Sequence, residues 1–274
     1  MRYSESTRQP ARVAEEPSGV NAPGFVRFWR HGVLVLMVVA PLVFLLARKP
    51  FGQDPQFHNF ADQRTFFSVP NFLDVSSNLP FLFVGVAGLW LWRRNRVAGA
   101  STAWTIFFAG VALVSLGSAY YHWRPCNETL VWDRLPMTVA FMAMSVALLN
   151  EFISQKLGRF LLIPALLLGF SSVLYWHWSD DLRFYRWLQM IPLLMTPVVM
   201  VLFKTRYTHQ LLLLLALGCY ALAKVSEAHD PDIFAFTNGA VGGHAVKHLL
   251  AAAGCFVLLE MLRRRRPVLQ WTPT

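Results

Sequence analysis

The chain has 274 residues, of which 55% are hydrophobic and only 15% are charged. Soluble domains carry about a quarter charged residues, and here the deficit accompanies long apolar runs, which excludes an ordinary soluble domain and indicates a membrane protein. The net charge of +10 does not indicate nucleic-acid binding, because Lys and Arg lie in short patches beside apolar runs, where they set membrane topology. The three cysteines form no CxxC pair, so neither a disulfide framework nor a cysteine metal site is expected.

The amino-terminal 30 residues are polar and contain five Arg and three Pro, so we expect a disordered cytoplasmic tail over residues 1–30. The first apolar run, 32–47, is short for a spanning helix and contains Pro41. A cleaved signal peptide is the alternative interpretation. The long polar lead and the lack of a small-x-small site before Arg48 favour an uncleaved transmembrane helix over residues 31–48.

Seven further apolar runs follow, most of them near the ~20 residues that an apolar core of ~30 Å requires. They cover residues 76–92, 102–121, 132–150, 159–177, 184–203, 210–227 and 241–262. Each is expected to be helical, because lipid offers an unpaired backbone group no hydrogen-bond partner. The predicted fold class is therefore all-α, a polytopic membrane helical bundle of eight helices.

The basic residues predict the orientation of this bundle. Most of the 25 Lys and Arg fall in residues 1–30, 93–96, 156–159, 204–206 and 263–266. These segments lie before the first predicted helix and after every second helix that follows. An amino terminus in the cytoplasm therefore places all of them on the cytoplasmic side of the membrane. The loop 228–240 lies on the other side and has no Lys or Arg. Both termini are expected to be cytoplasmic, including a basic tail over residues 263–274.

Five polar residues gather at the predicted outer ends of three helices. Ser118 and His122 end the third helix, Asp133 opens the fourth, and His244 and His248 open the last in the segment GGHAVKHLL. Residues four apart share one helix face, and the topology puts all five residues at one depth near the non-cytoplasmic surface. Ionisable residues in spanning segments are costly and are usually functional.

Three imidazoles suit zinc, because a catalytic zinc site commonly has three protein ligands and leaves its fourth position to water or substrate. We expect His122, His244 and His248 to bind one Zn²⁺ ion. A carboxylate nearby can take a proton and later deliver it to a leaving amine, and Asp133 fits that role. Ser118 could hydrogen-bond a developing oxyanion.

The remaining polar and aromatic residues are given structural interpretations. Five histidines are expected to be interfacial or packing residues, namely His31, His58, His177, His209 and His229. Lys224 and Glu227 are three apart near the end of the seventh helix and are expected to pair with each other. Trp176, Trp178 and Trp187 are assigned to an interfacial aromatic belt.

The pattern Ser118-x-x-x-His122, Asp133 and His244-x-x-x-His248 resembles the signature of the alkaline ceramidase family, which belongs to the CREST group of membrane hydrolases and receptors. The segment VSSNLPFLFVG is similar to the start of the family's first core helix, and WDRLPMT to its Asp-x-x-Pro-Met element. The resemblance covers residues 71–262. It implies a seven-transmembrane hydrolase core, zinc held by the three histidines, Ser118 and Asp133 in the active site, and hydrolysis of the amide bond of ceramide.

The sequence also departs from that family. Residues 1–50 add a helix outside the seven-helix core, and the acidic calcium-binding segment of eukaryotic members is not matched. The corresponding stretch, FFSVPNFLDVSSN, holds only Asp74 as an acid, with Asn71 where a glutamate is expected. We therefore do not expect calcium dependence. Compact loops and Arg-rich tails are typical of a bacterial inner-membrane protein, and because many bacteria make no sphingolipid, another N-acyl lipid is an alternative substrate.

Three other functions compete with a lipid amidase. A receptor or sensor of the progestin and adipoQ type shares the CREST pattern, but short loops and the absence of a signalling domain count against it. A haem carrier needs one axial histidine on each side of the haem, whereas His244 and His248 share a face. A transporter would be expected to show internal repeats or broken helix pairs, and the sequence shows neither.

Overall fold

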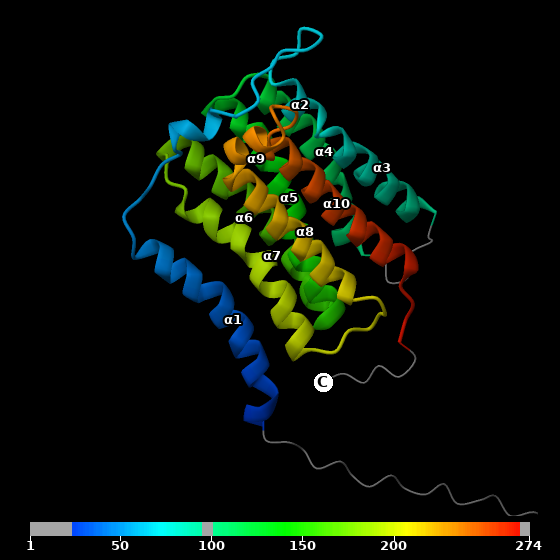
Figure 1. The fold of residues 1–274 in the computed structure, drawn as a ribbon. Helices are drawn as coiled ribbons and strands as arrows, with labels where there is room; N and C mark the ends of the chain where they lie inside the picture. The colour runs from blue at the N-terminus through cyan, green and yellow to red at the C-terminus, as the bar shows by residue number, and fades with distance from the viewer. Residues whose placement is uncertain (1–23, 95–100, 269–274) are drawn as a thin grey trace, which may run out of the picture.

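The structure is a computed structural model that describes residues 24–94 and 101–268 (Figure 1). Most of the expected tail 1–30 and the end of the tail 263–274 therefore lie outside the described residues. Within the described ranges, eight helices are long and apolar enough to cross a membrane, which confirms the predicted all-α polytopic bundle.

The long helices are α1 (Gly24–Leu46), α3 (Leu79–Arg93), α4 (Thr102–Trp123), α5 (Asn127–Phe152), α6 (Gln155–Ser179), α7 (Arg183–Leu202), α8 (Leu211–Ala228) and α10 (Gly243–Arg264). From α3 onward each long helix contacts the next long helix in the chain, and most helix ends lie close to those expected. Helix α1 starts before the apolar run that predicted it, and α5 starts at Asn127, before the expected start at residue 132.

One end of the bundle carries the short elements (Figure 1). They are the 3₁₀ turn η1 (Pro55–His58), α2 (Phe72–Ser76) and α9 (Asp230–Phe236). The run expected as a helix over residues 76–92 corresponds to α3, which starts at Leu79 and not at residue 76. The short helix α2 precedes it, and Ser77 and Asn78 separate the two just before Pro80. Proline lacks a backbone N–H and favours the first turn of a helix, so it marks a new start here.

Six helices enclose a central cavity. Helices α3, α4, α5, α7, α8 and α10 all contribute lining residues, and successive members of this ring contact one another. Helix α6 packs behind α5, and α1 lies outside the ring against α7. The indole Nε1 of Trp187 on α7 donates to the Val38 carbonyl of α1 at 2.7 Å, which fastens the extra helix to the ring.

The aromatic-belt interpretation is wrong for two of its three tryptophans. Trp176 is 1% exposed and Trp187 is 7% exposed, so both lie in the interior, and only Trp178 faces outward. Trp176 is held there by the Arg134 guanidinium, which lies 4.0 Å from its ring centroid. A cation–π partner on a neighbouring helix can draw an indole inward, and hydropathy alone does not reveal that partner.

Helices α4 and α5 approach most closely beside the polar residues of the sequence pattern. A Cβ added to Gly117 would lie 2.0 Å from the Trp132 carbonyl oxygen. Pro136 follows Trp132 by four residues within α5 and has no N–H, so it cannot donate the helical hydrogen bond to that carbonyl. A glycine on α4 and a proline on α5 thus bring Ser118 and Asp133 together across the two helices.

This contact gives a stability prediction. Gly117→Ala is expected to lower the free energy of unfolding by about 1–3 kcal/mol, the usual cost of overpacking, because the Trp132 backbone cannot give way. The measurement is the thermal unfolding of the detergent-solubilised protein. Gly218→Ala on α8 is the matched control, since nothing lies within 4 Å of its added Cβ. An equal midpoint for both variants contradicts the account.

Candidate metal centre

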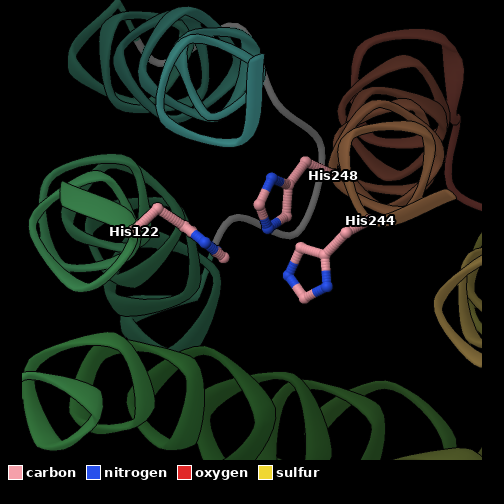
Figure 2. A group of neighbouring side chains, drawn as sticks. All are labelled: His122, His244 and His248. Carbon is pink, nitrogen blue, oxygen red and sulfur yellow. The ribbon is translucent and has the colours of Figure 1, made fainter. Parts of the chain in front are cut away.

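The three histidines of the sequence pattern meet at the end of the bundle that carries the short elements. One ligand atom from each of His122, His244 and His248 lies within 4.8 Å of the other two, and all three residues are buried. Figure 2 shows His122 approaching from α4 while His244 and His248 come from successive turns of α10, with ring nitrogens directed into the space between them. Three buried histidines this close together can hold a metal ion.

A metal fits this group on two observations. Both ring nitrogens of His122 are buried and have no hydrogen-bond partner among the described residues. Such orphaned polar atoms are costly unless something binds them. Ligands at about 2.0–2.1 Å from one zinc ion are about 3.4 Å apart in tetrahedral geometry, so shifts of about an ångström would close the three rings onto one ion.

His248 is oriented by a residue at the break between α2 and α3. The Ser77 hydroxyl lies 2.8 Å from His248 Nδ1, and it also donates to the Asp74 carbonyl at 3.2 Å. The hydrogen bond between Ser77 and His248 Nδ1 fixes the orientation of the imidazole ring and leaves its Nε2 available to a metal ion. A metal-ligating histidine usually has such a partner on its other nitrogen, which sets the tautomer and the ring orientation.

His244 and His122 are positioned through their backbones. The carboxylate of Asp230 accepts from the His244 amide at 2.9 Å through one oxygen and from the Ala61 amide at 2.8 Å through the other. The side-chain amide of Asn71 donates to the His122 carbonyl at 2.8 Å. Asp230 therefore caps the start of α10, and Asn71 ties the end of α4 to the start of α2.

A loop covers the centre from outside the bundle. The ring of Phe60 packs against His122 and His244, with centroid distances of 4.6 Å and 4.5 Å, and is itself buried. Next to it, Asp62 bonds Arg64, which also donates to the Ala240 carbonyl at 2.9 Å. The Arg64 guanidinium holds the pKa of the Asp62 carboxyl below its usual range, against the opposing effect of burial. Asp62 therefore stays charged and keeps the loop closed at neutral pH.

Ser118 and Asp133 face each other across the close contact of α4 and α5. The Ser118 side chain hydrogen-bonds the Asp133 carboxylate, and both line the same cavity as His248. The structure thus brings all five residues of the sequence pattern to one end of the bundle. An acid and a hydroxyl beside three imidazoles are the groups that a hydrolytic site requires.

Besides the histidines and the pair of Ser118 and Asp133, a set of charged side chains on α8 and α10 lies beside His244. The Lys247 ammonium donates to His244 Nε2 at 2.6 Å and to Glu227 Oε1 at 3.1 Å. Glu227 also pairs with Lys224, as the sequence predicted. A lone pair that accepts a hydrogen bond cannot also bind a metal, so metal binding through His244 Nε2 would turn Lys247 toward Glu227.

The cavity next to the histidines runs deep into the bundle and has a volume of about 190 Å³. On α10 its lining extends from Lys247 and His248 to Leu258, a helical rise of about 15 Å. The deep part is lined by apolar side chains such as Phe107, Val111 and Leu258. A polar mouth above an apolar shaft suits a molecule with one polar end and one long apolar end.

The five histidines given structural interpretations lie outside this centre. His58 bonds the Tyr121 hydroxyl at 2.9 Å and the Asn127 side chain at 3.0 Å, and His31 packs against Phe203. Within the described residues the one group of side chains that could hold a metal ion comprises His122, His244 and His248. The interfacial or packing interpretation is therefore confirmed for His31 and His58.

Sequence reasoning missed the residues that orient the histidines, namely Phe60, Ser77, Asp230 and Lys247. Asp230 lies in the loop 228–240, where no residue spacing connects it to a histidine. Ser77 lay inside a segment similar to a family core helix. A signal for Lys247 was present, because a lysine between two histidines on one helix turn must lie beside the metal centre.

Ser77 gives a test of the positioning argument. Ser77→Ala is expected to weaken metal binding about 10–100-fold, the usual cost of losing the partner of a ligating histidine. The measurement is a competition titration against a metal chelator of known affinity. Ser76→Ala is the matched control, because the Ser76 hydroxyl donates to the Leu73 carbonyl of its own helix and not to a histidine. Equal affinities of the two variants would remove Ser77 from this role.

A comparison with known protein families covers part of the candidate site. A family model described as Ceramidase matches residues 66–230, which include Ser118, His122 and Asp133. The match ends before His244 and His248, so the placement of these two histidines beside His122 is supported by the structure and not by the family match. No curated protein matches the chain. Because the matched segment spans more than half of its length, the chain belongs to the ceramidase family, whose members are hydrolases of amide bonds.

Proposed function

We propose that this protein is a zinc-dependent membrane amidase that hydrolyses the N-acyl bond of ceramide or of a related N-acyl lipid and releases a fatty acid. The observation that carries the proposal is the group of buried histidines at the mouth of an apolar cavity. In this proposal His122, His244 and His248 hold the zinc ion, and residues 71–262 form the hydrolase core. When bound, the ion would polarise the amide carbonyl and lower the pKa of a bound water.

The protein's own residues supply binding and proton transfer. The apolar shaft below the histidines receives the acyl chain, which places the amide at the polar mouth. Asp133 takes a proton as the water oxygen adds to the acyl carbon, and it returns that proton to the amine as the C–N bond breaks. Ser118 donates its hydroxyl hydrogen to the Asp133 carboxylate before the reaction starts. Once Asp133 has taken up the proton it no longer needs that bond, so the Ser118 hydroxyl donates instead to the carbonyl oxygen as this oxygen gains charge.

We further propose the orientation that the basic residues predict. Both termini lie in the cytoplasm, the bilayer is a bacterial inner membrane, and the site lies near the non-cytoplasmic face. Arg263 and Arg264 end α10 on the side opposite its histidines, and Arg93 ends α3 on that same side. This distribution supports the proposal through the positive-inside rule.

The reaction is tested with purified protein and N-palmitoylsphingosine in ¹⁸O-labelled water. Palmitate and sphingosine are expected in equal amounts, with one ¹⁸O atom in the palmitate, because water supplies the new oxygen. Saturable binding of N-acyl lipids without release of fatty acid from any of them would contradict the amidase and indicate a receptor.

A further inference from the structure

The mouth of the cavity carries more positive than negative side chains. Three flexible cations line it, Arg186 on α7, Lys224 on α8 and Lys247 on α10. The carboxylates that line it are Asp133 and Glu227. Bound zinc would add two further positive charges. Uncompensated charge at the edge of a membrane is costly, so this excess favours an anionic ligand.

A fourth cation, Arg134, also lines the cavity but is engaged by the protein. Its guanidinium bonds the Gln53 side chain and lies over the rings of Trp176 and Tyr185, and the residue is buried. Arg134 therefore joins α5 to neighbouring elements. The flexible cations differ from it, because none has such a cage of rings.

The two lysines share a single carboxylate. Glu227 pairs with Lys224 and also with Lys247, whose Nζ lies 3.1 Å from Oε1. One carboxylate neutralises only one of these ammonium groups, and Asp133 can neutralise only one further cation. Arg186 is exposed and forms none of the ion pairs recorded within residues 24–94 and 101–268. At least one positive charge at the mouth therefore lacks a protein counter-charge.

All three flexible cations lie at one depth. Arg186 follows the start of α7 by three residues, Lys224 precedes the end of α8 by four, and Lys247 follows the start of α10 by four. At a rise of about 1.5 Å per residue, each is about 5–6 Å from its helix end. They therefore flank the histidines at the depth where the group next to the scissile amide would lie.

We propose that the substrate carries a negatively charged oxyacid, a carboxylate or a phosphate, close to its amide, and that Arg186, Lys224 and Lys247 bind this group. The inference rests on the proposed amidase function and names its substrate class, an anionic N-acyl lipid. A guanidinium and two ammonium groups match carboxylate and phosphate oxygens by charge and by hydrogen-bond donors. The hydroxyl headgroup of ceramide has no charge for them to bind.

Two matched substrate pairs test the proposal. N-palmitoylglycine differs from N-palmitoylethanolamine by a carboxylate in place of a hydroxymethyl group, and ceramide 1-phosphate differs from ceramide by a phosphate. The anionic member is expected to have at least a tenfold higher kcat/KM in one pair, which also identifies the oxyacid. That ratio is expected to fall as ionic strength rises, because salt screens the cations.

Variants assign the preference to the named cations. The double variant Arg186→Gln with Lys224→Gln is expected to bring the ratio of kcat/KM within a pair close to one, whereas Lys224→Arg keeps it. Lys204→Gln is the matched control, since Lys204 is exposed in the loop between α7 and α8 and does not line the cavity. A ratio unchanged in the double variant overturns the assignment.

Binding separates this inference from the amidase itself. If the neutral members are hydrolysed as well as the anionic ones in both pairs, the anionic preference is wrong and the amidase stands. If no member is hydrolysed, the proposed amidase function is wrong. Calorimetric titration of the wild-type chain with the same four lipids then tests the preference for an anionic ligand. Tenfold tighter binding of an anionic member then supports it, and equal affinities overturn it.

Discussion

His248→Ala is expected to reduce bound metal from one ion per chain to near none and to abolish fatty-acid release. The variant removes one of the three proposed ligands of the metal ion. Loss of a ligand should weaken binding by more than the roughly 100-fold that loss of a ligand's partner costs. The measurement is elemental analysis of the purified protein by mass spectrometry, with thermal unfolding to show that the variant is folded.

The control for this variant is another histidine at the same end of the bundle. His177 lies near the end of α6 and is exposed, outside the metal-binding group. His177→Ala is expected to keep the full metal content and activity. Unchanged metal content in His248→Ala would remove that residue from the ligand set and leave the centre without its third imidazole.

Asp133→Asn is expected to lower kcat by about 10²–10⁴-fold and to leave the metal content unchanged. The amide keeps the size of the carboxylate and its hydrogen bond with Ser118, but it cannot take up a proton from water. This pattern of lost turnover with retained metal separates proton transfer from metal binding. It is measured by steady-state kinetics together with elemental analysis of the same preparation.

An exposed aspartate at the same end of the bundle serves as the matched control. Asp232 lies in the short helix α9 and does not line the cavity. Asp232→Asn is expected to retain wild-type kcat. Near-normal turnover in Asp133→Asn would contradict the proton-transfer role, and loss of metal from that variant would instead make Asp133 a ligand.

The spanning helices were predictable because each is a long run whose apolar composition alone requires a membrane and a helix. Helix α2 was not predicted, because its 5 residues are too few to form an apolar run that could span a membrane. The short helix α9, with 7 residues, was missed for the same reason. The inward position of Trp176 depends on Arg134 of another helix.

The histidine group was predictable because two of its members are four residues apart on one helix and topology brings the third to the same surface. The residues that orient these histidines were not predictable in the same way. Phe60, Asn71 and Asp230 lie in loops or at helix ends, and their contacts depend on the path of the chain over the bundle. No spacing rule connects a loop residue to a histidine far away in sequence.

The most direct test of the central claim is a zinc titration of chelator-treated protein, with fatty-acid release measured at each addition. The account predicts no activity before zinc is added, a linear rise, and a break at one ion per chain, because His122, His244 and His248 form a single site. Full activity in metal-free, folded protein, or a rise without a break at one equivalent, would contradict it.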